Sequence, residues 1–127
     1  MSRRCVLVVD DEPMIANLMR EVLARLPEAV DVLTVADGRA AIEAVRHDAP
    51  DLVMLDINMP LMNGLEALKH IRALDPRLPV LMITGSDSPA ASAALANGAF
   101  GYLPKPMDLR YVSHLVELAL GSRSPRR

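Results

Sequence analysis

The chain has 127 residues, a length that fits one domain and leaves no room for two of ordinary size. Its apolar fraction of 51% is enough for a hydrophobic core without disulfide or metal staples. The net charge of −2 excludes a strongly basic surface for nucleic acid or membrane, and one Phe, two Tyr and no Trp exclude a base-stacking platform.

The amino terminus carries arginines, as a secretion signal does, but the apolar run that follows ends at Asp10. A secretion signal needs about 7–15 apolar residues and a membrane span about 20. The single cysteine, Cys5, lies in this short run, which predicts a buried small side chain and no internal disulfide. We therefore expect a cytoplasmic protein.

In chain order, strand-like segments occupy residues 5–9, 30–35, 52–55, 80–83 and 100–103. The first, third and fourth are apolar throughout, as expected for strands of a parallel sheet that helices cover on both faces. The second segment includes Asp31 and Thr34, and the fifth is short. Both of these suit the edges of a sheet.

Helical patterns alternate with the strands, at residues 13–26, 38–47, 65–74, 89–97 and 108–120. Pro13 suits the first turn of the first helix, and Gly121 suits the C-cap of the last. Such alternation predicts an α/β fold, a three-layer sandwich around a parallel sheet. The flavodoxin-like strand order 2-1-3-4-5 would put the two edge-like strands at the edges.

Polar residues follow four of the strands. Asp10 and Asp11 follow the first, Asp56 the third, Thr84 the fourth and Lys105 the fifth. The carboxyl ends of parallel strands share one edge, so these side chains should meet. Close carboxylates repel by on the order of 4 kcal/mol per pair, and an all-oxygen cluster that needs a cation suits magnesium. Because aspartate can attack phosphorus, and a lysine and a hydroxyl can hold phosphoryl oxygens, the sequence predicts a phosphoryl-transfer site.

Each residue taken singly has a plainer interpretation. Asp10 and Asp11 could favour the start of a helix, Asp56 could be a loop acid, Thr84 a turn residue and Lys105 a solvated lysine. These interpretations would have to coincide on one edge of the sheet, which favours a shared function. Only one other lysine occurs in a chain that otherwise uses arginine, which indicates a need for a compact charge.

Five motifs stand in series along the chain: Val9-Asp10-Asp11-Glu12-Pro13, Leu55-Asp56-Ile57-Asn58-Met59-Pro60, Asn63-Gly64-Leu65-Glu66, Ile83-Thr84-Gly85 and Gly101-Tyr102-Leu103-Pro104-Lys105-Pro106. With them the chain, from about Arg4 to Leu120, resembles the receiver domain of bacterial response regulators, of the kind found in chemotaxis regulators. The main departure is Asn63, where such domains often have aspartate at a turn position that is not catalytic.

The resemblance implies that Asp56 is the phosphoacceptor in a two-component phosphorelay. A histidine kinase or a histidine phosphotransfer protein would donate the phosphoryl group. Mg²⁺, or Mn²⁺ as its substitute, would be held by Asp11, Asp56 and the backbone carbonyl of Asn58, with Asp10 reaching it mainly through water. The domain would not be an enzyme beyond its own phosphorylation and autodephosphorylation.

The resemblance also implies that Thr84 and Lys105 bind the phosphoryl group and that Tyr102 is a switch that follows Thr84 inward. The Lys105–Pro106 peptide would be cis. Asn58 and Ser86 occupy positions that tune how fast the phosphoryl group is lost, and both are small and polar, so we expect a short-lived signal.

We expect a receiver domain over residues 1–120 and a disordered tail or the start of a linker over 121–127. The resemblance implies that the output surface is formed by the helix at 89–97, the strand at 100–103 and the helix at 108–120. Residues 88–99 carry no charge and the last helix is apolar nearly all round. This pattern predicts an apolar contact with a downstream protein, a fused output domain or a second copy, and no direct contact with nucleic acid or membrane.

Three other functions stay open at this point. A magnesium-dependent phosphatase would need a second acid two residues after the nucleophile, where Asn58 stands, and a cap domain. A flavodoxin-type FMN carrier would need a hydroxyl- and glycine-rich loop after the first strand, where the chain has acids and a proline. A receiver that acts without phosphorylation would usually lack one of the key residues.

Overall fold

The computed structural model describes residues 3–59, 62–85 and 88–122. Strands and helices alternate through it. They are β1 (Arg4–Val9), α1 (Pro13–Ala24), β2 (Val30–Val35), α2 (Gly38–Asp48), β3 (Leu52–Asp56), α3 (Gly64–Leu74), β4 (Val80–Thr84), α4 (Ser88–Ala96), β5 (Gly101–Pro104) and α5 (Leu109–Gly121).

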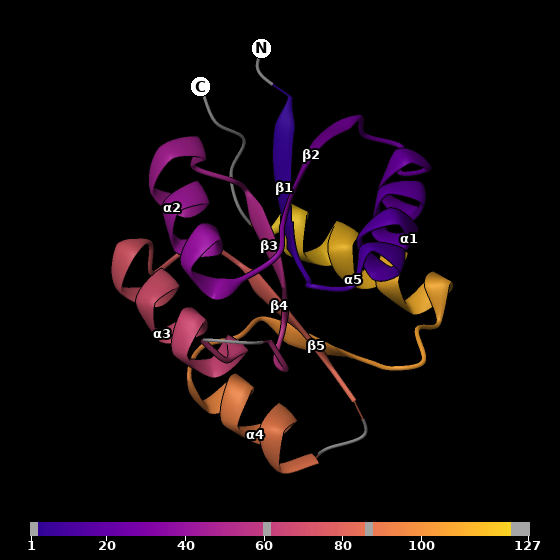
Figure 1. The fold of residues 1–127 in the computed structure, drawn as a ribbon. Coiled ribbons are helices and arrows are strands. Elements are labelled where there is room, and N and C mark those ends of the chain that lie inside the picture. Colours follow the sequence, from indigo (N-terminus) through magenta and orange to yellow (C-terminus); the bar gives the residue numbers. More distant parts are fainter. Residues whose placement is uncertain (1–2, 60–61, 86–87, 123–127) are drawn as a thin grey trace.

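The strands form a single parallel sheet in the order β2-β1-β3-β4-β5, which confirms the flavodoxin-like arrangement. Helices α1 and α5 cover one face of the sheet, and α2, α3 and α4 cover the other (Figure 1). The strand order reverses between β1 and β3. Their carboxyl ends therefore lie side by side at the point where open α/β sheets bind ligands.

Each central strand contributes side chains to two cores. In β1, Val6 and Val8 pack in the core under α1 and α5, whereas Leu7 and Val9 pack in the core under α2, α3 and α4. All four are fully buried. Because neither face of the sheet meets water here, the strand reads as a continuous apolar run instead of an alternating one.

Several helices begin with a side chain that accepts a hydrogen bond from the first turn. The Oδ1 atom of Asp37 accepts from the Ala40 N–H at 2.8 Å, and that of Asn63 accepts from the Glu66 N–H at 2.9 Å. Helix α1 is different: Glu12 occupies its N-cap position, and the described structure shows no capping bond from that side chain. Pro13 at the first helical position sets the backbone instead.

The structure corrects three details of the sequence analysis. Helix α1 ends at Ala24, earlier than expected, and Gly121 is the last residue of α5 instead of its C-cap. Ser122 takes the C-cap position, where its hydroxyl donates to the Ala119 carbonyl at 2.6 Å. Cys5 is half-buried instead of buried, because the helices cover β1 fully only from Val6 onward.

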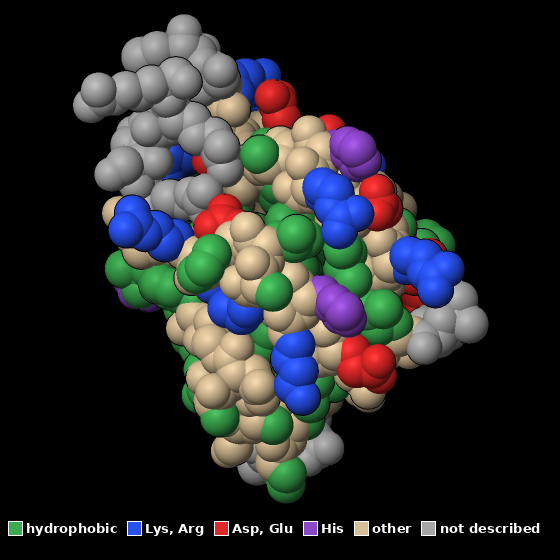
Figure 2. Space-filling model, turned by 90° about the vertical axis from the view of Figure 1, so that its left-hand side faces the viewer, with side chains coloured by type: hydrophobic (Ala, Val, Ile, Leu, Met, Phe, Trp, Pro, Cys, Tyr) green, Lys and Arg blue, Asp and Glu red, His purple; other side chains and the backbone are tan. Residues whose placement is uncertain are grey.

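The surface differs from one end of the molecule to the other. Figure 2 shows the side covered by α2, α3 and α4, where charged side chains are spread over the upper and central parts and the lower part, over α4, shows none. Helix α4 contains only Ser, Pro, Ala and Leu. No helix in the described ranges is both long and apolar enough to cross a membrane.

Candidate functional site

The fold brings the predicted site residues to one edge of the sheet. Asp10 follows β1, Asp56 ends β3 and Thr84 ends β4, and their exposed fractions are 4%, 1% and 1%. Asp11 is exposed although its neighbour Asp10 is buried. One carboxylate oxygen from each of Asp10, Asp11, Glu12 and Asp56 lies within 4.8 Å of the others.

Asp56 is held at a fixed place by its own loop. Its Oδ1 atom accepts a hydrogen bond from the Asn58 N–H at 3.0 Å, and the Gly64 N–H donates to the Ile57 carbonyl at 2.8 Å. A Cβ atom added at Gly64 would lie 2.3 Å from the Asp56 carbonyl oxygen, so only glycine allows this close approach. Oδ2 of Asp56 faces Lys105, whose Nζ is 3.8 Å away.

The cluster is electrostatically unfavourable for its own carboxylates. Burial raises the pKa of Asp56 to about 6, and the neighbouring Asp10 and Asp11 add to this effect. The Asn58 N–H and the Lys105 ammonium group act in the opposite direction. Burial likewise raises the pKa of Asp10. A positive ion in the cluster would reverse these shifts, because it favours the charged forms.

Asp10 supplies an independent sign that the cluster suits a cation. Its Oδ1 atom accepts from the Glu12 N–H at 2.8 Å, whereas its buried Oδ2 atom has no hydrogen-bond partner within the described residues. A buried oxygen of this kind is costly unless water or an ion completes its contacts. Because every donor is an oxygen, the residues present fit a hard ion such as Mg²⁺.

Lys105 lies beside the carboxylates. Its backbone N–H donates to the Thr84 carbonyl at 2.7 Å, which ties the segment after β5 to the end of β4. Burial alone would lower the pKa of Lys105, but Asp56, Glu12 and Asp10 together outweigh it and raise that pKa. The neighbouring carboxylates therefore favour the charged form of the side chain. The Lys105–Pro106 peptide is cis, as the resemblance implied.

Thr84 and Tyr102 occupy neighbouring strands. The Thr84 hydroxyl donates to the Gly85 carbonyl at 3.1 Å, and a Cβ atom added at Gly85 would meet nothing within 4 Å, so there is open space beside it. Tyr102 lies on β5 in register with Met82 and is 37% exposed, so its side chain is not enclosed in the core. Ser86, which was expected to tune phosphoryl loss, lies outside the described residues.

Two acidic residues escaped the sequence analysis. Glu12 was part of a motif without a role, yet its Oε1 atom is 3.3 Å from Lys105 Nζ. The sequence held a signal for a role of this side chain, since glutamate is not among the residues preferred at the N-cap of a helix, the position directly before Pro13. Asp51 is buried for a structural reason, because its Oδ2 atom accepts from the Cys5 N–H at 2.8 Å.

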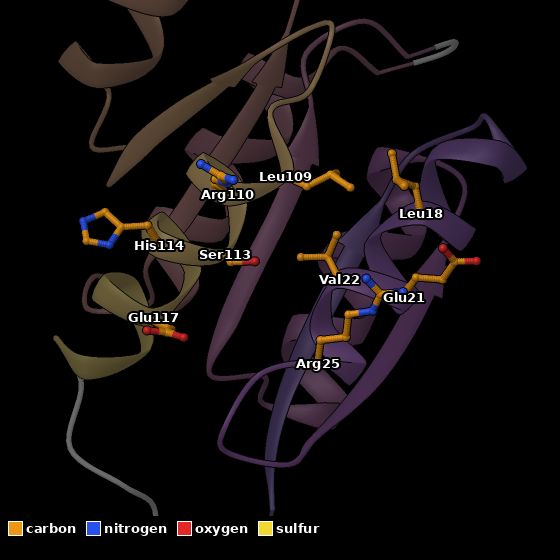
Figure 3. Close-up of a pocket in the computed structure, with 9 residues that line it drawn as sticks. All are labelled: Leu18, Glu21, Val22, Arg25, Leu109, Arg110, Ser113, His114 and Glu117. Carbon is orange, nitrogen blue, oxygen red and sulfur yellow. The ribbon is translucent and has the colours of Figure 1, made fainter.

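A groove of about 450 Å³ lies elsewhere, between α1 and α5 (Figure 3). Val22 of α1 and Leu109 of α5 point into the space between the two helices. None of the carboxylates of the cluster lines this groove. A smaller hollow of about 270 Å³ is lined by Asp10, Asp11 and, on β2, Thr34. The groove between α1 and α5 is therefore separate from the acidic cluster.

Comparison with known proteins gives a consistent result. The sequence profile described as "Response regulator receiver domain" matches residues 6–117. The chain is 38% identical over 124 residues to a protein-glutamate methylesterase/protein-glutamine glutaminase of Nocardioides sp., covering 95% of this chain and 34% of that protein. It is 40% identical over 121 residues to the DNA-binding transcriptional regulator NtrC of Escherichia coli K12, covering 94% of this chain and 25% of that protein. The chain thus spans only about a third or less of these curated relatives.

Two solved structures match over nearly their whole length. The receiver domain of NtrX from Brucella abortus has a TM-score of 0.86 at 33% identity, over 93% of this chain and 99% of that one. A putative response regulator from Chloroflexus aurantiacus has a TM-score of 0.87 at 28% identity, over 94% of this chain and 99% of that one.

Proposed function

Because the chain belongs to the response regulator receiver domain family, we propose that Asp56 accepts a phosphoryl group from a histidine kinase or a histidine phosphotransfer protein. The observation that carries the proposal is the state of Asp56 itself. It is 1% exposed, its Oδ1 atom is fixed by the Asn58 N–H, and its Oδ2 atom faces a lysine. In the transfer, this carboxylate forms the O–P bond while the P–N bond to the donor histidine breaks and leaves its electron pair on nitrogen.

Mg²⁺ is the cofactor that fits this role, with Mn²⁺ as a substitute. Asp11, Asp56 and the backbone carbonyl of Asn58 would hold it, and Asp10 would contact it mainly through water. The bound ion supplies charge neutralisation for the transferred group. The Oδ2 atom of Asp10, which has no hydrogen-bond partner among the described residues, and the spacing of the carboxylates support this assignment.

Thr84 and Lys105 are proposed to hold the phosphoryl oxygens, the hydroxyl as a donor and the ammonium group as a point charge. The Thr84 hydroxyl, which donates to Gly85 in this structure, would turn toward the phosphoryl group. Its movement would let the partly exposed ring of Tyr102 swing inward. The phosphorylation state of Asp56 would in this way alter the surface of β5.

That surface carries apolar side chains suited to a partner. Exposed residues here include Leu95 on α4, Phe100 directly before β5, and Tyr111 and Leu118 on α5, and α4 carries no charge. We propose that phosphorylation changes an apolar contact here, with a downstream protein, a fused output domain or a second copy. Sedimentation of phosphorylated and unphosphorylated protein, each with and without Leu118→Glu, tests the homodimer. An association state that phosphorylation and the substitution both leave unchanged would count against it.

The receiver unit is proposed to cover residues 1–120, and a linker or tail to begin at 121; residues 123–127 lie outside the described part. We propose that this domain is not an enzyme beyond its own phosphorylation and dephosphorylation. The named activities of the relatives are those of longer proteins, of which this chain matches a part. A cytoplasmic location also stays a prediction.

Intact-mass measurement after incubation with acetyl phosphate and Mg²⁺ tests the phosphoacceptor. The wild-type protein should gain the mass of one phosphoryl group, and Asp56→Ala or EDTA should abolish the gain. Asp48→Ala, at an exposed position that ends α2, is the matched control and should react normally. A phosphoryl group that persists in Asp56→Ala would refute the assignment.

Family membership supports the receiver over the phosphatase and the FMN carrier among the earlier alternatives. The remaining alternative, a receiver that acts without phosphorylation, is tested by the same experiment. No gain in mass in the wild-type protein would favour it.

A further inference from the structure

Within the described residues, Glu12 is the member of the acidic cluster to which the phosphoacceptor proposal gives no role. We propose that Glu12 is a positioning residue that holds the Lys105 ammonium group beside Asp56 and competes with an arriving phosphoryl group for it. The inference rests on the proposed function of Asp56 and adds a restraint on the capture of the phosphoryl group.

The distances favour Glu12 as the closer partner of the lysine. Lys105 Nζ lies 3.3 Å from Oε1 of Glu12, within hydrogen-bond reach, and 3.8 Å from Oδ2 of Asp56, beyond it. The two partners are 93 positions apart in the chain, so the contact exists only because the carboxyl ends of β1 and β5 lie at the same end of the sheet. In this state the ammonium group is therefore shared, with its hydrogen bond directed to Glu12.

Helix α1 does not account for the glutamate. Glu12 is the N-cap residue, yet its side chain makes no capping bond in the described structure, and glutamate is not among the residues that cap well. Its backbone is fixed on both sides: the N–H donates to Asp10 at 2.8 Å, and the carbonyl accepts from the Ile15 N–H at 3.1 Å. The fixed backbone leaves the long side chain to reach Lys105, which the shorter aspartate would not do.

Phosphorylation would set Glu12 against the phosphoryl group. A phosphoryl group brings about −1.5 to −2 charges to Asp56, so Lys105 must turn from Glu12 to the new oxygens. Glu12 would weaken binding of the phosphoryl group in two ways, because it holds the Lys105 ammonium group and because its own negative charge repels the anion. The side chains of Glu12 and Lys105 are 59% and 28% exposed, so their pair is a weak one that can break readily. Removal of the Glu12 carboxylate should increase the affinity for a phosphoryl group or its mimic by about two- to five-fold, the range expected for an exposed ion pair.

Beryllofluoride, a phosphoryl mimic, tests this in the full chain by isothermal titration calorimetry at saturating Mg²⁺. Saturation is set for each variant by its own Mg²⁺ titration, since the loss of a carboxylate weakens the attraction for the metal. Glu12→Gln should bind beryllofluoride about two- to five-fold more tightly than wild type. Glu12→Asp, which keeps the charge but loses the reach, should shift in the same direction by less. Glu21→Gln, an equal charge change on the exposed side of α1, should match wild type.

The same titration in a Lys105→Gln background separates positioning from simple repulsion. If Glu12 acts through the lysine, the fold-change in affinity caused by Glu12→Gln should be less than half as large in the Lys105→Gln background as in the wild-type background. An equal effect in both backgrounds, or an affinity unchanged by Glu12→Gln in the wild-type background, would overturn the inference. Urea midpoints of all variants are compared so that a change of stability is not mistaken for positioning.

The two proposals fail in different ways. If wild type binds no beryllofluoride, or Asp56→Ala binds it equally well, the phosphoacceptor role of Asp56 falls, and the role of Glu12 falls with it. If wild type binds in an Asp56-dependent manner and Glu12→Gln behaves like wild type, only the positioning role of Glu12 is refuted.

Discussion

Replacing Asp56 by asparagine should stabilise the metal-free protein. The substitution keeps the shape of the side chain and an oxygen that can accept from the Asn58 N–H. It removes the negative charge that burial and the neighbouring Asp10 and Asp11 make unfavourable. Lys105 loses one ion-pair partner but keeps Glu12 at 3.3 Å.

The magnitude follows from the pKa. Burial raises the pKa of Asp56 from 3.8 to about 6, and each unit corresponds to about 1.4 kcal/mol, so the ionised carboxylate costs the folded state roughly 3 kcal/mol. Weakening of the ion pair with Lys105 offsets part of this. We therefore expect Asp56→Asn to raise the free energy of unfolding by about 1–3 kcal/mol at pH 7 without metal.

The sign of the pH dependence is fixed by the direction of the shift. The folded protein holds the Asp56 proton more tightly than the unfolded chain, so this group favours the folded state at low pH. That contribution is lost as the pH rises from 3.8, the value for the unfolded chain, to about 6. The advantage of Asp56→Asn should therefore be near zero at pH 3.5 and complete by pH 7.

Urea unfolding followed by far-UV circular dichroism measures this, because the chain has no tryptophan. Both proteins are compared in EDTA at several pH values, with Asp48→Asn at an exposed position as the charge control. Added Mg²⁺ should stabilise wild type more than Asp56→Asn, since ligand that binds the folded state adds to its stability. An Asp56→Asn protein that is less stable than wild type at pH 7 would refute the reasoning. A stability advantage of Asp56→Asn over wild type that is as large at pH 3.5 as at pH 7 would also refute it.

Three further substitutions probe how the site is held. Gly64→Ala should destabilise by about 1–3 kcal/mol and weaken beryllofluoride binding, because the new Cβ would lie 2.3 Å from the Asp56 carbonyl oxygen; Gly121→Ala, where it would meet nothing within 4 Å, is the control, and equal urea midpoints would count against the contact. Asn63→Ala should lower the free energy of unfolding in urea by about 1 kcal/mol, because the cap on α3 is lost. Asn63→Ser, whose hydroxyl can still cap the helix, should keep most of that free energy, and similar losses in both variants would argue against capping. Lys105→Gln should weaken beryllofluoride binding about tenfold or more in the same calorimetric titration, and an unchanged affinity would exclude the lysine from the site.

The fold could be predicted from the sequence because its main determinant is coarse. Fully apolar strands, as in Val6–Val9, must lie inside a sheet covered on both faces, and the two less apolar strands must take the edges. Once that order is set, the ends of β1, β3, β4 and β5 meet without any knowledge of side-chain contacts. The positions of Asp10, Asp56 and Thr84 follow from topology alone.

What the sequence did not predict depends on side-chain direction and reach. Asp10 and Asp11 are adjacent in the connection between β1 and α1, yet one is buried and the other exposed. Cys5 has the neighbours of a core residue but lies near the start of its strand, where the helices no longer cover it. The contact of Glu12 with Lys105 depends on a long side chain and on the place of a residue 93 positions away.

The same edge of the sheet connects stability with the proposed switch. The two packed cores hold Asp10 and Asp56 in a buried place where burial raises the pKa of both. Holding these ionised carboxylates close together therefore lowers the free energy of unfolding. A cation or a proton relieves this unfavourable energy. A cation that binds the folded site would therefore add to the stability of the folded protein, and it would also favour the proposed rearrangement of Lys105 and Thr84. A metal-free protein whose stability did not respond to Mg²⁺ at pH 7 would show that the acids of this cluster are not what the ion binds.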